Sequence, residues 1–541
     1  MATSPANAHS PSSERFLKNV LWTWVGGALT IFVGLVLSPY VIRKLGPEGY
    51  GLWALLYSLV GYYGLLDLGV RSSIVRYTAY FHASGDMRDV NELINTVIAY
   101  YTAGASILVP VSFVLSRYAD RIFNVSPAFS QDFSRLVIVV GLSAMIGINV
   151  FAAALQGLGR FELCTRISVV TIGIRSIGAF LLLYFGFGLF ALGVNVLAAQ
   201  ILSYGVGYVA FRRALPEFRL SFRLARFRML RRIWDYSAHT FVANIAVQLL
   251  NQSPAVLIGL LRPAALIGYF SFPSKLIQYS ADFIERVGNV SHSAGTALAA
   301  RGDAEPLRRL AIYANRYCLI LFAPLGLFFI VYGGDLLRVW ISPDFAANST
   351  AALLPLVLGG GLAMAAQHNS GALLYSLGEH RRYSRALLVE AAFSISCMAV
   401  AIPPFGVAGA AWGFSIPMIA IRGFVTPWLL ARALRIPYAP FLRAILAGPL
   451  LAAVPVYALA TTAKHLWLPG ANWPQLILGG AAIALLYWGV TAVTSIEPEH
   501  RRVGVRWAAG VAARARGPFQ RVQPAAEAAP ASTRTPDRAD S

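Results

Sequence analysis

Ionisable side chains are rare inside the long apolar segments of this chain, and their spacing there points to function. A charge near the middle of a bilayer costs about 2.5–3.5 kcal/mol, so such a residue is expected to face a cavity or a partner. Lys275, Gln278, Asp282 and Arg286 recur every three to four residues, which places them on one face of a helix, with Glu285 beside them. Five cations could meet an anionic ligand, and four acids could take up a proton or Na⁺. The cations are Lys275, Arg422, Arg175, Arg71 and Arg286, and the acids are Asp67, Asp282, Glu285 and Glu390.

Structural pairing is the alternative for these charges. Asp67 and Arg71 are four residues apart, so they can neutralise each other at the wettable end of a helix. Lys275 has no acid three or four residues away, which favours a contact with a ligand. Arg175 and Arg422 do not deprotonate in practice, so each needs an anion, which could be Glu390, a lipid phosphate or a substrate.

Uncharged polar residues form a second group of candidates. Asn244, Gln248 and Asn251 follow one another at helical spacing, and His368 lies between Gln367 and an asparagine in another apolar segment. Such groups suit a hydrated cavity that accepts sugars, or they can bond one helix to the next. The sequence contains no HExxH, GxSxG or Walker A motif, and its three cysteines are dispersed. We therefore expect no catalytic residue, metal site or cofactor, and no direct use of ATP.

The elements that position these residues are membrane helices. Of the 541 residues 57% are apolar and only 13% are charged, whereas an average soluble domain is about 25% charged. A spanning helix needs about 20 apolar residues. By that measure the chain is an all-α integral membrane protein with about 14 transmembrane helices. The expected spans lie near 16–42, 48–72, 91–116, 133–156, 163–184, 188–211, 236–261, 265–290, 310–332, 351–375, 384–403, 406–430, 440–462 and 473–495.

Positive charge sets the expected orientation. With the N-terminus in the cytoplasm, the inside segments hold 33 Lys and Arg and the outside segments hold 8. Both termini are therefore predicted to be cytoplasmic. The predicted organisation is a disordered tail (1–15), a six-helix N-lobe (16–213), a basic cytoplasmic linker (214–235), a six-helix C-lobe (236–432), helices 13 and 14 (433–495) and a disordered basic tail (496–541).

An internal repeat relates the two lobes. Seven short motifs recur in the same order at a nearly constant sequence offset, among them Ser38-Pro39 with Ser253-Pro254, and Gly85-Asp86 with Gly302-Asp303. Six helices per repeat preserve orientation, so the halves are parallel and related by an axis along the membrane normal. This arrangement is typical of transporters that open alternately to each side, with the site between the halves.

Two turns carry a resemblance to a known family. The turn Leu45–Gly51 reads LGPEGYG and is followed by Asp67-Leu68-Gly69, and the turn after the fourth span reads LQGLGRF from Leu155 to Phe161. In these motifs the chain resembles the polysaccharide repeat-unit flippases, also called O-antigen or oligosaccharide flippases. They form part of the multidrug/oligosaccharidyl-lipid/polysaccharide exporter superfamily. The resemblance covers about residues 16–432 and, more loosely, the last two helices.

The resemblance implies two six-helix lobes around a central cavity. It also implies transfer of a polyprenyl-pyrophosphate-linked oligosaccharide to the outer leaflet of a bacterial inner membrane, for surface polysaccharide biosynthesis. Basic cavity residues would meet the pyrophosphate, and a glycan polymerase and export complex are implied partners. A lipid II flippase and a cation-coupled multidrug exporter are the alternatives within the superfamily. A pI near 10.2 also raises nucleic acid as a partner, but the basic residues lie between apolar segments, so none is expected.

Overall fold

The structure is a computed structural model that describes residues 13–67, 69–146, 149–467, 470–502 and 506. Every regular element within them is helical, as predicted for an all-α membrane protein. In chain order the longer helices are α1 (Ser13–Tyr63), α2 (Val70–Ala83), α3 (Met87–Ser116), α5 (Pro127–Ile146), α6 (Val150–Gly157), α7 (Phe161–Tyr184), α8 (Leu189–Ala214), α9 (Phe227–Leu261), α10 (Ala265–Arg301), α11 (Ala304–Trp340), α14 (Met364–Ser376), α15 (His380–Ala420), α16 (Thr426–Ala433), α17 (Tyr438–Trp467) and α18 (Trp473–Thr494). Short helices are α4 (Ala119–Ile122), α12 (Pro343–Ser349) and α13 (Leu353–Leu356).

Two of the helices are too long to cross a bilayer once, and each contains a break. The 51 residues of α1 would extend about 75 Å if straight, and the apolar core of a bilayer is about 30 Å thick. Gly46 interrupts α1 with φ 74° and ψ 175°, and Gly406 interrupts α15 with φ 55° and ψ −124°. Positive φ values of this kind are readily adopted by glycine alone.

Ten helical segments in the described part of the chain are long and apolar enough to cross a membrane. Two of them, 26–63 and 380–433, contain the breaks at Gly46 and Gly406, so each has the length for two crossings. The α5–α6 pair and α10 fall outside those ten segments but coincide with predicted spans. The fold class is confirmed, and the count of fourteen stays a prediction.

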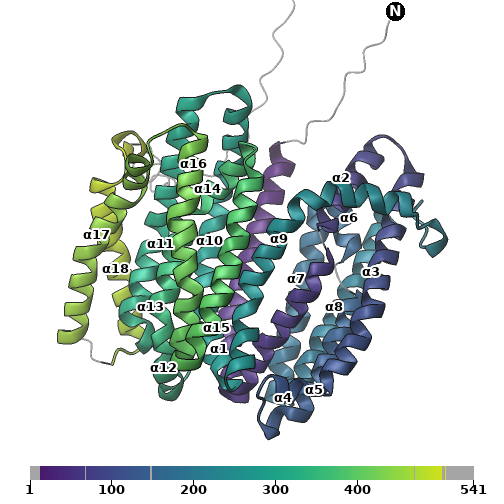
Figure 1. The fold of residues 1–541 in the computed structure, drawn as a ribbon, viewed down its shortest axis with the longest axis horizontal. Coiled ribbons are helices and arrows are strands. Elements are labelled where there is room, and N and C mark those ends of the chain that lie inside the picture. The colour runs from purple at the N-terminus through teal and green to yellow at the C-terminus, as the bar shows by residue number, and fades with distance from the viewer. Residues whose placement is uncertain (1–12, 68, 147–148, 468–469, 503–505, 507–541) are drawn as a thin grey trace, which may run out of the picture.

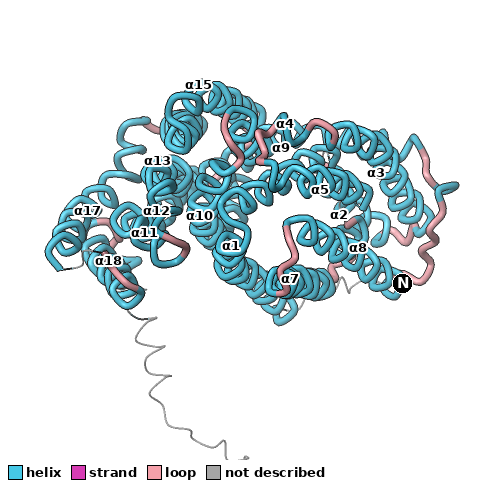
Figure 2. Tube along the Cα trace, turned by 90° about the horizontal axis from the view of Figure 1, so that it is seen from below, coloured by secondary structure: helices cyan, strands magenta, loops and turns pink. Residues whose placement is uncertain are grey.

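The helices form two bundles side by side (Figure 1). The N-lobe helices α2, α3 and α5–α8 lie on one side of α1 and α9, and α11–α16 lie on the other. Seen from below, α17 and α18 stand at the outer edge against α11, away from the N-lobe (Figure 2). The predicted linker contains a short turn of 3₁₀ helix, Phe222–Leu224, and α9 already begins at Phe227 within it.

The repeat is visible in the backbone. Gly85 and Gly302 both have left-handed backbones, with φ of 75° and 74°, and each is followed by an aspartate at the N-cap of the next helix. Gly159 and Gly378, which follow the ends of α6 and α14, also both have positive φ values, of 72° and 77°. Corresponding turns therefore reverse the chain in the same conformation in both lobes.

The two lobes meet through repeat-related glycines. A Cβ atom added at Gly51 would lie 2.6 Å from the Ala264 carbonyl oxygen, and one at Gly268 would lie 2.1 Å from that of Pro47. Gly51 and Gly268 are related by a sequence offset of 217, and so are Pro47 and Ala264, so each contact is the symmetry mate of the other. Gly85 and Gly302 are also 217 residues apart. The same sequence offset therefore relates the two lobes from their interface to the starts of α3 and α11.

Candidate binding cavity between the two lobes

Side chains at one end of the lobe interface close it symmetrically. Arg43 donates from Nη2 to the Trp340 carbonyl oxygen at 2.5 Å, and Asn124 donates from Nδ2 to the Gly259 carbonyl oxygen at 3.1 Å. Arg43 corresponds to Gly259 and Asn124 to Trp340 at an offset of 216, so the two contacts are again symmetry mates. They lie beside α4 and α12, at the opposite end from the start of α1 (Figure 1).

A cavity of about 1010 Å³ lies between the lobes beyond this closed end. Its wall starts near Val41 and Tyr50 and extends to Tyr375 and Tyr383. Tyr375 lies next to the end of α14 and Tyr383 lies in the first turn of α15, so the cavity reaches the face on which α1 begins. Its size is at the upper end of the range of small-molecule pockets, which is about 300–1,000 Å³.

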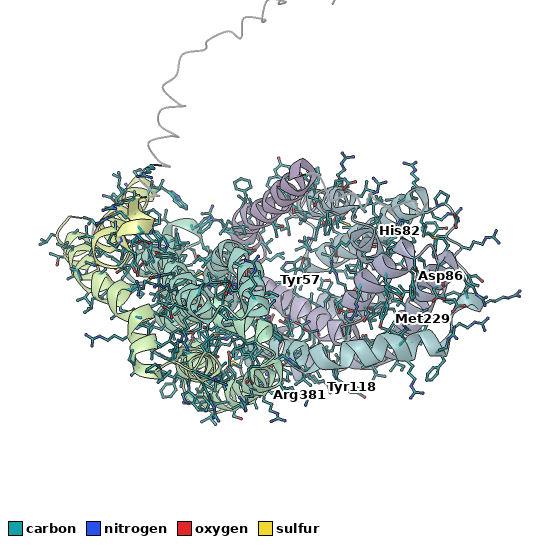
Figure 3. All side chains as sticks on the ribbon, turned by 90° about the horizontal axis from the view of Figure 1, so that it is seen from above. Tyr57, His82, Asp86, Tyr118, Met229 and Arg381 are labelled. Atoms are coloured by element: carbon teal, nitrogen blue, oxygen red, sulfur yellow. The ribbon has the colours of Figure 1, made fainter. Side chains whose placement is uncertain are left out.

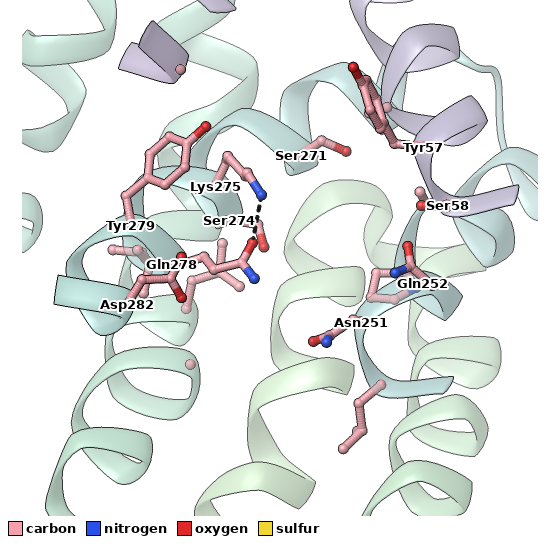
Figure 4. Close-up of a pocket in the computed structure, with 18 of the residues that line it drawn as sticks. Tyr57, Ser58, Asn251, Gln252, Ser271, Ser274, Lys275, Gln278, Tyr279 and Asp282 are labelled. Carbon is pink, nitrogen blue, oxygen red and sulfur yellow. Dashed lines mark hydrogen bonds between the residues drawn. The ribbon is translucent and has the colours of Figure 1, made fainter. Parts of the chain in front are cut away.

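Helix α10 supplies much of the polar wall. Lys275, Gln278 and Asp282 all line the cavity, as the predicted helical face requires, together with Tyr279 (Figure 4). The Lys275 ammonium donates to Gln278 Oε1 at 3.0 Å and lies 5.2 Å from the centre of the Tyr279 ring. No ion pair to Lys275 occurs within the described residues. Its only hydrogen-bond partner among them is a neutral amide, so the charge can still bind an anion.

Arg422 and Glu390 form an ion pair in the C-lobe wall. Arg422 Nε lies 2.9 Å and 3.2 Å from the two carboxylate oxygens of Glu390, whose side chain is fully buried. Arg422 itself lines the cavity, and it lies in a short π-helical segment, Ile421–Val425. A buried acid thus meets the guanidinium, which was one of the alternatives left open by the sequence.

The predicted amide stripe of α9 divides between three environments. Asn251 lines the cavity beside Gln252 (Figure 4). Gln248 donates to the Gly61 carbonyl oxygen at 2.8 Å and so bonds the two lobes. Asn244 is exposed and lies outside the cavity lining. Gln248 therefore bonds one helix to another, and a role of Asn251 in binding a ligand stays a prediction.

His368 lines the cavity in front of a buried polar network between α11 and α14. Asn315 donates to Ser370 Oγ at 2.8 Å and accepts from the Asn369 backbone, and Ser370 donates to Gln367 Oε1 at 2.7 Å. Gln367 also lines the cavity, and its buried Nε2 has no hydrogen-bond partner among the described residues. The network fixes the Gln367 amide at the cavity wall with a donor still to be satisfied.

Asp67 and Arg71 lie outside the cavity lining. Helix α1 gives way to a 3₁₀ turn, Gly64–Asp67, and α2 starts after Gly69. Asp67 Oδ1 accepts from the Tyr101 hydroxyl at 2.7 Å and from the Arg71 backbone N–H at 2.9 Å, which caps the first turn of α2. In the sequence, Asp282 and Arg286 repeat the four-residue spacing of Asp67 and Arg71. At the offset of 217, however, Asp67 corresponds to Ile284, so the two Asp–Arg pairs are not repeat mates.

The N-lobe wall carries one cation, Arg175, among the described residues. Trp53, Tyr57 and Tyr50 accompany it, so this wall is mainly aromatic and apolar. The side chains of Glu285 and Arg286 lie outside the described residues. No group of three or more His, Cys, Asp or Glu that could hold a metal ion occurs in the described part of the chain.

Several polar residues of the cavity were missed by sequence reasoning because they are neutral and occur singly. Ser58, Ser271, Ser274 and Gln252 all line it. The repeat could have found one of them. Ser58 and Lys275 are related by the same offset of 217, so the cation has a hydroxyl as its mate in the other lobe (Figure 4).

Both the sequence and the fold of this chain are similar to those of known proteins. A family described as "Polysaccharide biosynthesis protein" matches residues 16–284. The match spans the N-lobe, α9 and the first half of α10. It is 23% identical over 474 residues to the uncharacterized membrane protein EpsK of Bacillus subtilis, covering 85% of this chain and 91% of EpsK. It is 22% identical to a protein of Shigella flexneri that bears the name O-antigen transporter, covering 77% of this chain and 98% of that protein.

A solved lipid II flippase, MurJ in an inward closed conformation, has the same fold. The TM-score is 0.68 at 14% identity, over 87% of this chain and 98% of the flippase. A multidrug transporter of the MOP superfamily, solved in an inward-facing conformation, also has this fold. Its TM-score is 0.66 at 12% identity, over 74% of this chain and 95% of that protein. The Shigella flexneri relative is named a transporter and the solved structure a flippase, which agrees with a transporter rather than an enzyme.

Proposed function

We propose that this protein flips a polyprenyl-pyrophosphate-linked oligosaccharide repeat unit from the inner to the outer leaflet of the bacterial cytoplasmic membrane, for surface polysaccharide biosynthesis. The observation that carries the proposal is the chemistry of the cavity. It combines the cation Lys275 with amides, hydroxyls and aromatic rings in a space of about 1010 Å³. A pyrophosphate needs cations, a glycan needs hydrogen-bonding groups, and both are present. The name of the Shigella flexneri relative supports the same class of cargo.

The geometry supports alternating access as the mechanism. Two parallel lobes meet at symmetric contacts at one end, and the cavity extends to the other end. With both termini in the cytoplasm, the open end faces the leaflet on which the substrate is made. Rocking of the lobes would break the contacts of Arg43 and Asn124 and open the cavity outward. The polyprenyl chain would stay in the lipid while the headgroup crosses.

Roles for the charged residues follow within this proposal. Lys275 and Arg422 contact the pyrophosphate from the C-lobe, and Arg175 contacts it from the N-lobe. Asn251, Gln367 and His368 meet the sugars. Asp282, Glu390 and Asp67 are the described candidates for binding a coupling ion, with Glu285 as a further one. A glycan polymerase would take up the flipped unit.

The experiment compares lipid-linked glycans in cells with and without the gene. Polyprenyl-pyrophosphate glycans are extracted, identified by mass spectrometry, and compared with the amount of surface polysaccharide. We expect a complete repeat unit to accumulate while the surface polymer is lost, and plasmid-borne protein to reverse both. Normal glycan levels combined with loss of dye efflux would assign a multidrug exporter instead. Accumulation of lipid II would assign a lipid II flippase.

A further inference from the structure

The segment that joins the two lobes presents an unusual surface. Between α8 and the first turns of α9 the chain carries eight arginines, and all of them are exposed. We call this surface the linker patch. Its arginines are Arg212, Arg213, Arg219, Arg223, Arg226, Arg228, Arg231 and Arg232. Three large apolar side chains, Leu220, Phe222 and Phe227, are exposed among them, and Phe227 is 82% accessible.

Side chains of α3 hold the backbone of the linker in place. Asn95 donates to the Arg219 carbonyl oxygen at 2.8 Å and accepts from the Ser221 N–H at 2.7 Å. One turn earlier, Asn91 accepts from the Arg219 N–H at 2.7 Å. Thr96 Oγ1 accepts from the Arg226 N–H at 2.9 Å. The backbone is thus bonded at several points, and the arginine side chains are free to project outward.

Apolar side chains of the linker complete the attachment. Leu215, Phe218, Met229 and Ile233 are all buried in the core of the N-lobe, and Phe218 packs on the ring of Phe151. Seen from above, Met229 lies on the start of α9 at the N-lobe, beside the end of the molecule marked by Asp86 (Figure 3). The linker is therefore part of the N-lobe surface, and Arg223 and its neighbours have fixed positions.

The charge of the patch is uncompensated within the described residues. None of its eight arginines takes part in an ion pair there, and its only described acid is Glu217. Arg232 alone has a partner of another kind, lying 5.2 Å from the Tyr77 ring and 5.1 Å from the Phe81 ring. Exposed arginines mixed with exposed phenylalanine and leucine match the boundary of an anionic bilayer, where acyl chains and headgroups meet.

We propose that the linker patch is a binding site for anionic phospholipid headgroups of the leaflet on which both termini lie. The proposal rests on the proposed orientation of the protein. Helix α9 starts in the patch, on the N-lobe, and continues along α15 in the C-lobe. A headgroup bound there would fix one end of the helix that connects the moving lobes. Bound anionic lipid would thereby change the free energy that is needed to move the lobes relative to each other.

The test measures lipid binding by the purified full-length protein. Detergent micelles are titrated with phosphatidylglycerol or phosphatidylcholine, and bound lipid is counted by native mass spectrometry. The variant R219Q/R223Q/R226Q removes three patch charges without altering the backbone bonds. R301Q/R381Q/R385Q removes three exposed charges from the C-lobe as the matched control. N91A/N95A keeps every charge but frees the linker from α3.

An arginine near an anionic surface contributes about fivefold to binding. We expect R219Q/R223Q/R226Q to weaken phosphatidylglycerol binding by about tenfold or more, with phosphatidylcholine binding unchanged, and the control to retain wild-type binding. N91A/N95A should lose selectivity between the two lipids, and a thermal melt in the same micelles checks that it is folded. Equal losses in the patch variant and the control would overturn the proposal, since net charge alone would then explain binding. This binding assay needs no transport, so it can fail while the flippase proposal stands.

Discussion

The two lobes share a backbone plan but line the cavity with different chemistry. Their glycine turns, helix caps and closing contacts match at a nearly constant sequence offset. Their walls do not match. The C-lobe contributes Lys275, Asp282, Arg422 and His368, whereas the N-lobe contributes Arg175 within an aromatic surface. Symmetry is retained at the contacts between the lobes and lost in the cavity wall, which is what the proposed recognition of a ligand with one charged end requires.

The surroundings of two acids, Glu390 and the half-buried Asp67, show the same difference. In the C-lobe, Glu390 is buried against a guanidinium at the cavity wall. In the N-lobe, Asp67 is satisfied by a tyrosine hydroxyl and a backbone N–H, away from the cavity. The first arrangement couples an acid to a cation that a ligand could reach. The second one stabilises a break between two helices.

The largest expected effect concerns the Glu390–Arg422 pair. R422Q leaves a fully buried carboxylate without its cation and should cost about 3–5 kcal/mol of the free energy of unfolding. E390Q/R422Q should recover most of this loss, because no charge is then left unpaired. In the N-lobe, Y101F removes one hydrogen bond to Asp67 and should cost about 1.5–3 kcal/mol.

Denaturant unfolding in micelles, followed by tryptophan fluorescence, ranks these three variants. If R422Q were no more costly than Y101F, Glu390 and Asp67 would not differ in how strongly their partners stabilise the fold. The double variant separates lost charge pairing from lost packing. A double variant as unstable as R422Q would assign the effect to packing.

A smaller effect is expected at the shared interface, where the lobes should behave alike. G51A and G268A each place a Cβ atom against a backbone atom of the other lobe, and overpacking of this kind costs about 1–3 kcal/mol. Both variants should favour, by similar amounts, separation of the two lobes at the closed end of their interface. G173A is the matched control, because a Cβ atom there meets nothing within 4 Å.

Distances between spin labels on α4 and α12 report the closed end in each variant. We expect a longer distance for G51A and G268A and no change for G173A. A response from only one of the two glycines would show that the interface is less symmetric than its backbone.

The smallest effect belongs to the N-lobe cation. R175Q removes the single described cation of that wall and should lower surface polysaccharide by about twofold to fivefold at equal protein level, if its contact is secondary to that of Lys275. Polysaccharide measured per molecule of membrane-inserted protein checks this expectation. A loss as complete as that of a gene deletion would place the main anion contact in the N-lobe.

The fold could be predicted from the sequence because the features that indicate it are averaged over many residues. Apolar length and a repeated set of turns survive sequence drift. The candidate residues came instead from the rarity of charged and polar groups within the spans, and Lys275, Asp282, Asn251, His368, Arg175 and Arg422 lie on the cavity wall. Their contact with a ligand stays a prediction. Prediction from the sequence failed where contacts between distant parts of the chain determine the position of a residue. A helical face does not reveal that α1 breaks before Asp67, which removes Arg71 from the cavity lining. Nor does spacing show that Gln248 bonds to Gly61 across the interface.

The alignment of the two repeats was the other feature that the sequence did not determine. The sequence allowed Asp282 and Arg286 to be equated with Asp67 and Arg71 by a slip of a few residues. The contacts of Gly51 and Gly268 fix the offset at 217 in this region, so the slip does not occur. Only packing between the repeats carries that information, because single glycines are too common to align by themselves.

The central claim is that the C-lobe wall holds the anionic part of the cargo through Lys275. The most direct measurement moves this cation to its repeat mate in the N-lobe. Surface polysaccharide per molecule of inserted protein is compared for wild type, K275S, S58K and K275S/S58K in cells lacking the chromosomal gene. A charged hydrogen bond is worth about 1.5–3 kcal/mol, so K275S should lower export by about tenfold to a hundredfold. S58K alone should retain activity, and relocation should not restore the loss. Export by K275S/S58K at the wild-type level would contradict the claim, because the net charge of the cavity would then suffice in either lobe.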